Sequence, residues 1–67
     1  MSKKFHIETN DAGGYTVQAD TPEEALEKYL KDYGIEARIY KLGTHHDSNV
    51  KVMDETSGKE AYYQLQF

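Results

Sequence analysis

Residues 19–34, ADTPEEALEKYLKDYG, contain residues that can begin a helix, apolar residues at helical spacing and a glycine that can end the helix. This stretch limits the fold more than any other. Asp20 or Thr21 can cap the helix, and Pro22 suits its first position. Gly34 can take the left-handed conformation that ends a helix. One face carries apolar or aromatic residues at helical spacing: Ala25, Leu26, Tyr29, Leu30 and Tyr33. We therefore expect an amphipathic helix with a buried inner face and a charged outer face.

The rest of the chain has the alternating pattern of half-buried strands. Residues 4–9 and 15–19 form two such strands before the helix, and the turn-forming residues 10–14 join them as a hairpin. Three more strands are expected after the helix: residues 35–42, 50–54 and 60–67. The order ββαβββ predicts an α+β fold in which the helix packs on one face of a mostly antiparallel sheet.

Length and composition limit the chain to one small domain. A protein of 67 residues has room for one modest core, so we expect a single domain over residues 1–67. The sequence has no cysteine and therefore no disulfide framework or cysteine-based zinc site. No segment approaches the roughly 20 apolar residues that cross a bilayer. We expect a soluble protein in the cytoplasm of a bacterial host cell.

The alternation divides the sheet residues into two sets. The predicted core set would meet the inner helix face: Phe5, Ile7, Tyr15, Val17, Ile35, Ile39, Val50, Val52, Tyr63, Leu65 and Phe67. The other sheet face would carry a mixed set that includes Arg38, Tyr40 and Tyr62. That face is either an ordinary solvated sheet surface or a contact for a partner or a second copy. The pattern leaves open whether the C-terminal hairpin joins the sheet or folds over this face.

The negative charge is concentrated in the helical segment. Residues 20–36 contain six acidic residues and two lysines, a net charge of −4, whereas the remainder has six acidic and six basic residues and is neutral. Nucleic acid repels a surface of this sign, which argues against direct binding to phosphates. A partner with a basic surface is favoured, and the alternative is that the charges only keep a surface helix soluble.

No pattern in the sequence points to catalysis or to a cofactor. The three serines, Ser2, Ser48 and Ser57, do not lie in a nucleophile-elbow pattern. The helix carboxylates are expected to face water, where nothing separates their pKa values. The strongest metal candidates are the loop residues His45 and His46, accompanied in sequence by Asp47, with His6 as the candidate third imidazole. Because a site needs three or four converging ligands, we predict no metal site, no cofactor and no enzyme activity.

Residues 3–41 resemble the small phage-encoded inhibitors of bacterial RNA polymerase. The similarity lies in KKF at 3–5, YTVQADTPEEALEKY at 15–29 and GIEARIY at 34–40. In that family an acidic surface and arginines of the closing strand engage the polymerase; Arg38 matches one arginine and Tyr40 stands in place of another. The segment DTPEEAL also resembles the helix start of HicB-type antitoxins.

Charge and resemblance together predict a non-enzymatic phage or mobile-element inhibitor. It would bind and occlude a bacterial nucleic-acid-handling complex, either RNA polymerase or, in the manner of an anti-CRISPR protein, a CRISPR effector. The alternative is an HicB-like antitoxin or a small regulatory module, acting as a monomer or a homodimer. The predicted partner-binding residues are Glu23, Glu24, Glu27, Asp32, Arg38, Tyr40 and Tyr62.

Overall fold

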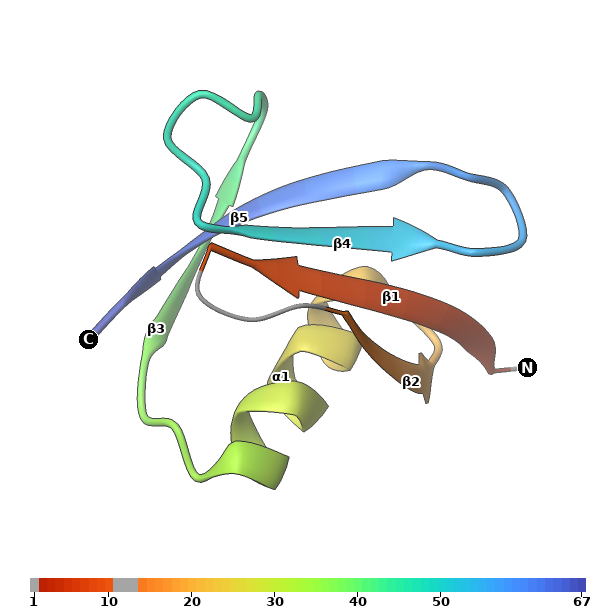
Figure 1. Ribbon diagram of the computed structural model, residues 1–67, viewed down its shortest axis with the longest axis horizontal. Coiled ribbons are helices and arrows are strands. Elements are labelled where there is room, and N and C mark those ends of the chain that lie inside the picture. The colour runs from red at the N-terminus through yellow and green to blue at the C-terminus, as the bar shows by residue number, and fades with distance from the viewer. Residues whose placement is uncertain (1, 11–13) are drawn as a thin grey trace.

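The chain folds as one helix packed on a five-stranded antiparallel sheet (Figure 1). This description rests on a computed structural model and covers residues 2–10 and 14–67. The elements are β1 (Lys3–Thr9), β2 (Tyr15–Ala19), α1 (Pro22–Tyr33), β3 (Arg38–Leu42), β4 (Val50–Asp54) and β5 (Glu60–Gln66). The predicted α+β class and the ββαβββ order are confirmed.

The sheet has the strand order β2-β1-β4-β5-β3, so its two edges are β2 and β3. The C-terminal hairpin enters the sheet because β4 pairs with β1, for example Ile7 opposite Val52. The strand β5 pairs with β4 through residues 60–63 and with β3 through residues 62–66, so Tyr62 and Tyr63 pair on both sides. The predicted turn at residues 10–14 includes 11–13, which lie outside the described residues.

The helix begins and ends with the capping residues that its sequence contains. The Thr21 side chain accepts a hydrogen bond from the Glu24 amide at 3.1 Å, and Pro22 occupies the first turn. Gly34 has a φ of 65°, and its amide donates to the Lys31 carbonyl at 3.2 Å. Among the described residues, no helix is long and apolar enough to cross a membrane.

The core lies between α1 and one face of β2, β1, β4 and β5. Eleven residues are buried there: Phe5, Ile7, Ala19, Ala25, Leu26, Tyr29, Leu30, Val50, Val52, Tyr63 and Leu65. Tyr15, Val17, Ile35 and Ile39 pack against this core but are only partly buried. The apolar alternation therefore identified most of the core.

Two predicted core residues are instead exposed. Tyr33 is 61% exposed because the last turn of α1 packs this ring against Tyr15 and Tyr29 at the rim of the core. Phe67 is 88% exposed because it follows the end of β5, beyond the part of the sheet that α1 covers. Their predicted places in the core were wrong.

The third strand begins at Arg38, three residues later than predicted. The reason is local: the Ile35 amide donates to the Leu30 carbonyl at 2.9 Å, which completes the helix C-cap. The chain must leave this cap before it can pair with β5. The first strand residue, Arg38, then lies opposite Gln66.

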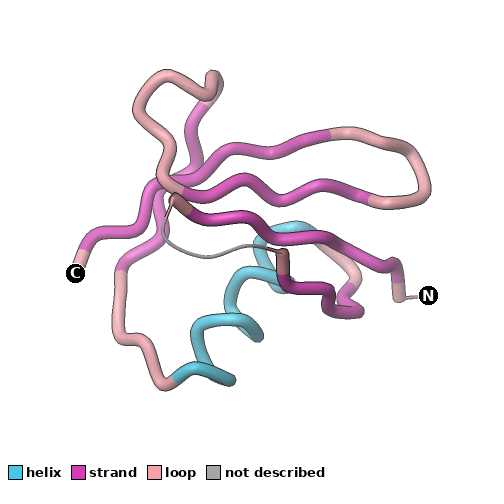
Figure 2. The backbone as a smooth tube through the Cα atoms, in the orientation of Figure 1, coloured by secondary structure: helices cyan, strands magenta, loops and turns pink. Residues whose placement is uncertain are grey.

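Residues 38–42 and 62–66 form a two-stranded extension of the sheet, which we call the β3–β5 arm (Figure 2). The helix packs mainly on β2, β4 and β1, so β3 lies beyond the helix, whereas Tyr63 and Leu65 of β5 still reach the core. The Asn49 side chain secures the arm by forming two hydrogen bonds with the Leu65 backbone. Its Nδ2 donates to the Leu65 carbonyl at 3.0 Å, and its Oδ1 accepts from the Leu65 amide at 2.8 Å. Asn49 thereby extends the β4–β5 ladder by one residue.

Candidate protein-binding surfaces

The outer face of α1 presents the predicted acidic residues to water. Glu23, Glu27 and Asp32 are exposed, and Glu24 is partly buried. The capped ends and the buried inner face hold α1 in one orientation on the sheet. The acidic side chains therefore stand on a rigid element and not on a loop.

Contacts within the protein separate these acidic residues into two groups. Lys28 lies 3.9 Å from Glu24 and also donates to the Gln18 carbonyl at 2.7 Å, so this lysine is drawn toward the β2 edge. No ion pair involves Glu23 or Glu27 within residues 2–10 and 14–67. These two carboxylates are the acidic groups on the helix that a basic partner can approach most freely.

Asp32 belongs to a different environment at the end of α1. The Tyr15 hydroxyl donates a hydrogen bond to Oδ2 of Asp32. This bond to the carboxylate is the main reason that the pKa of Tyr15 is raised. Tyr15, Tyr29 and Tyr33 also contact one another through their rings, with centroid distances of 5.0 to 5.6 Å. The spacing of apolar residues predicted these tyrosines in the core, but it did not predict the contact between Tyr15 and Asp32, which are 17 positions apart.

The remaining predicted binding residues lie on the opposite face of the sheet. Arg38 and Tyr40 belong to β3, Tyr62 belongs to β5, and the register places all three on the face away from the core. Tyr40 is 40% exposed. The structure therefore divides the predicted set into a helix surface and a sheet surface. A partner that binds flat against one layer would contact only one of them.

Tyr62 is part of a charged network that sequence analysis missed. Its hydroxyl donates to Oε1 of Glu60 at 2.9 Å. Lys51 lies 3.1 Å from Glu60 and 3.7 Å from Glu8, and Glu8 lies 3.3 Å from His6. The network joins β1, β4 and β5, so only the strand register could have predicted it.

The pKa shifts in this network have direct causes. The hydrogen bond and the charge of Glu60 raise the pKa of Lys51. Hydrogen bonds from Lys51 and then Tyr62 lower the pKa of Glu60. Donation to Glu60 raises the pKa of Tyr62. Each group is thus favoured in its usual ionisation state at neutral pH. The arrangement stabilises the charges of Lys51 and Glu60 and the neutral hydroxyl of Tyr62.

The histidine loop places two rings together beside this network. The His45 and His46 rings are stacked with a centroid distance of 5.6 Å, and His45 lies 5.8 Å from Tyr62. His6 packs instead over Gly14, where an added Cβ would collide with the imidazole. In the part of the chain that the structure describes, no group of three or more His, Cys, Asp or Glu side chains could hold a metal ion.

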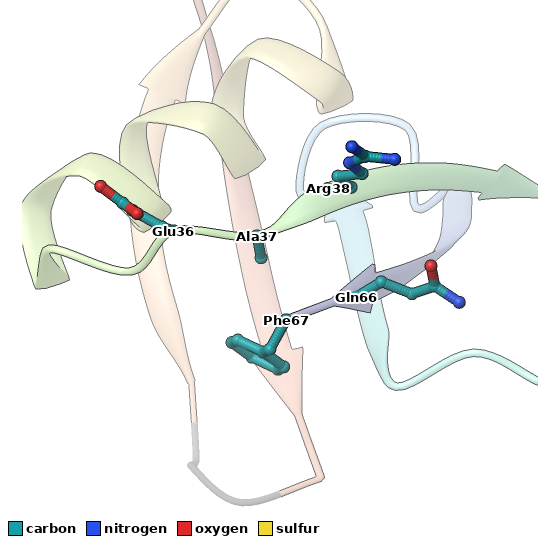
Figure 3. A pocket seen from close by; sticks show the side chains of 5 residues that line it. All are labelled: Glu36, Ala37, Arg38, Gln66 and Phe67. Carbon is teal, nitrogen blue, oxygen red and sulfur yellow. The ribbon is translucent and has the colours of Figure 1, made fainter.

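A shallow hollow of about 530 Å³ lies at the end of the β3–β5 arm. Figure 3 shows the five lining side chains around the start of β3 and the end of β5, pointing in different directions: Glu36, Ala37, Arg38, Gln66 and Phe67. A ligand site usually has polar groups that converge on one position. The hollow is an open contact surface next to Arg38, and its lining does not form such a constellation.

Comparisons with protein-family models, with curated proteins and with solved structures found no match to this chain.

Proposed function

We propose that this protein is a non-enzymatic binding module whose acidic helix face meets a basic surface on a bacterial nucleic-acid-handling complex. The observation that carries the proposal is the concentration of charge: residues 20–36 have a net charge of −4, and the rest of the chain is neutral. Glu23 and Glu27 lie on the exposed side of a helix that is capped at both ends. A rigid patch of one sign attracts a surface of the other sign and speeds association.

The mechanism that follows is occlusion. A groove that binds DNA or RNA is lined with lysine and arginine, so an acidic protein can occupy it in place of phosphates. Such an inhibitor needs no catalytic group and no cofactor. The phage origin and the choice of RNA polymerase or a CRISPR effector come from the resemblance of residues 3–41, and cytoplasmic action follows from those targets.

The test uses purified RNA polymerase and purified CRISPR effectors, with this protein immobilised. We expect one complex to be retained at low salt, released at high salt and displaced by duplex DNA. Glu23→Lys/Glu27→Lys should lower the association rate by about tenfold or more at low salt.

The matched control is Asp47→Lys/Glu55→Lys, which makes the same change in net charge at exposed positions outside the helix. This control should lower the association rate much less than Glu23→Lys/Glu27→Lys does. Equal losses in the two variants would contradict a role for the helix face. Retention of neither complex, together with capture of a single small toxin-like protein from a bacterial lysate, would instead favour the antitoxin alternative.

A further inference from the structure

The end of α1 carries an aromatic cluster that extends from the core to water. Tyr29 is 8% exposed and Tyr33 is 61% exposed. Their ring centroids are 5.0 Å apart, and Tyr15 lies 5.2 Å from Tyr29 and 5.6 Å from Tyr33. The exposed ring is therefore supported by two neighbours. A tyrosine held in this way loses little freedom on binding, and tyrosine is enriched among the residues that dominate interfaces.

A carboxylate is held beside the same cluster. The Tyr15 hydroxyl donates to Oδ2 of Asp32, and the Tyr15 ring contacts the Tyr33 ring. Asp32 and Tyr33 are thus brought together around one side chain from β2. Both residues are exposed, so a partner can reach the carboxylate and the ring.

The local field at this end of the helix favours a cation. The C-terminal turn of a helix carries partial negative charge from carbonyl groups that have no intrahelical donor. Asp32 lies in that turn beside the exposed Lys31, and the exposed Glu36 follows the Gly34 cap, so two acidic residues outweigh one lysine. An aromatic ring attracts cations to its face. The ring, the carboxylate and the helix end therefore favour the same kind of partner group.

A guanidinium uses this combination better than an ammonium does. It is planar, so it can stack on an aromatic ring while its N–H groups donate to a carboxylate. Lysine presents a compact, strongly hydrated charge that gains less from a ring face. We infer that Tyr33, Asp32 and Tyr15 form an arginine-binding site that anchors a basic protein partner. This inference rests on the proposed function, because it names the side chain on the partner that the acidic helix surface would recognise.

The probes are two fluorescent peptides, octa-arginine and octa-lysine, titrated against the full chain at low salt with anisotropy as the readout. The wild-type protein should bind octa-arginine more tightly. Tyr33→Leu keeps a good helix former and an apolar side chain but removes the ring. It should reduce the preference for arginine over lysine by about two- to fivefold, the value of an exposed cation–π contact.

Three further variants separate the ring from general effects. Tyr33→Phe keeps the aromatic face and should keep the preference. Tyr40→Leu removes an exposed tyrosine from the opposite face of the sheet and should also keep it. Asp32→Asn should weaken the binding of both peptides, because it removes a charge and leaves an oxygen that can accept from Tyr15.

The inference is overturned if wild-type protein binds both peptides equally, or if Tyr33→Leu keeps the full preference for arginine. An equal loss of preference in Tyr33→Leu and Tyr40→Leu would also overturn it, because the effect would not belong to this site. Because the peptides report on the site directly, a clear preference together with no retained nucleic-acid-handling complex would reject the proposed function and leave the arginine site standing.

Discussion

The two halves of the sheet have the same alternating sequence pattern but are held in different ways. In the β2-β1-β4 half, α1 covers one face, and Phe5 and Val52 are at most 1% exposed. In the β3–β5 arm, Tyr63 and Leu65 of β5 are buried, but Ile39 of β3 is only partly buried, and the Asn49 side chain supplements backbone pairing. The comparison shows that alternation marks the residues able to enter a core. Whether they do enter it depends on how far the helix reaches.

The largest effect should come from comparing one core truncation in each half. Leu26→Ala removes a side chain from the fully buried helix face and should cost about 2–5 kcal/mol in free energy of unfolding. Ile39→Ala in the arm should cost only about 1 kcal/mol, because that side chain is already partly in water.

Urea denaturation followed by circular dichroism measures both values. If Leu26→Ala leaves too little folded protein, both variants can be compared with sulfate present, which strengthens apolar burial. Equal costs would mean that the arm is as firmly packed as the helix-covered half.

The contact made by Asn49 gives the next effect. Asn49→Ala leaves the partly buried amide and carbonyl of Leu65 without their partner and should cost about 1–3 kcal/mol. Hydrogen exchange should show faster exchange of the Leu65 amide, while amides of β1 keep most of their protection. The variant Asn49→Asp retains an acceptor but loses the donor, so it should protect the Leu65 amide better than alanine does. Unchanged exchange at Leu65 in Asn49→Ala would show that the side chain does not hold the arm.

The smallest effect concerns pH and the β4–β5 turn, which lies at the opposite end of β5 from the Asn49 contact. The Asp54 carboxylate accepts from the Thr56 amide at 2.9 Å, and this hydrogen bond lowers the pKa of Asp54 below its ordinary value of 3.8. A carboxyl with a lowered folded pKa stabilises the fold above its unfolded pKa, and that contribution disappears as the pH falls through the folded value. The free energy of unfolding should therefore decrease as the pH is lowered below about 4.

The variant Asp54→Asn can still accept the Thr56 hydrogen bond but does not titrate. Its unfolding free energy should fall less steeply over the same acidic range. Glu60→Gln should behave similarly, because the pKa of Glu60 is lowered by Lys51 and Tyr62. An identical acid profile for Asp54→Asn and wild-type protein would contradict the assigned role of Asp54.

Local sequence signals predicted the helix and the existence of all five strands. Thr21, Pro22 and Gly34 act within one or two turns, so their effect can be read from neighbouring residues. The alternation also placed Val50 and Val52 in the core. Helix caps and strand alternation depend on residues that are neighbours in the chain, so the sequence specifies them directly.

Features that depend on strand order could not be predicted in the same way. The Lys51 contacts with Glu8 and Glu60 require β4 to lie between β1 and β5. The position of Tyr33 depends on where the end of α1 meets β2, and the exposure of Phe67 depends on the helix stopping short of the arm. Each of these features depends on how the elements are arranged in the fold, and no local pattern in the sequence specifies that arrangement.

The position of β5 between β4 and β3 has a consequence for how the protein is made. The segment Arg38–Leu42 finds its neighbour only when residues 62–66 have been synthesised. At usual rates of translation, the intervening residues take roughly one to five seconds to add. During that interval the nascent chain holds β3 as an unpaired strand, and the sheet cannot close until the last strand arrives. Folding of this small protein should therefore finish after synthesis of its final strand and not in step with the growing chain.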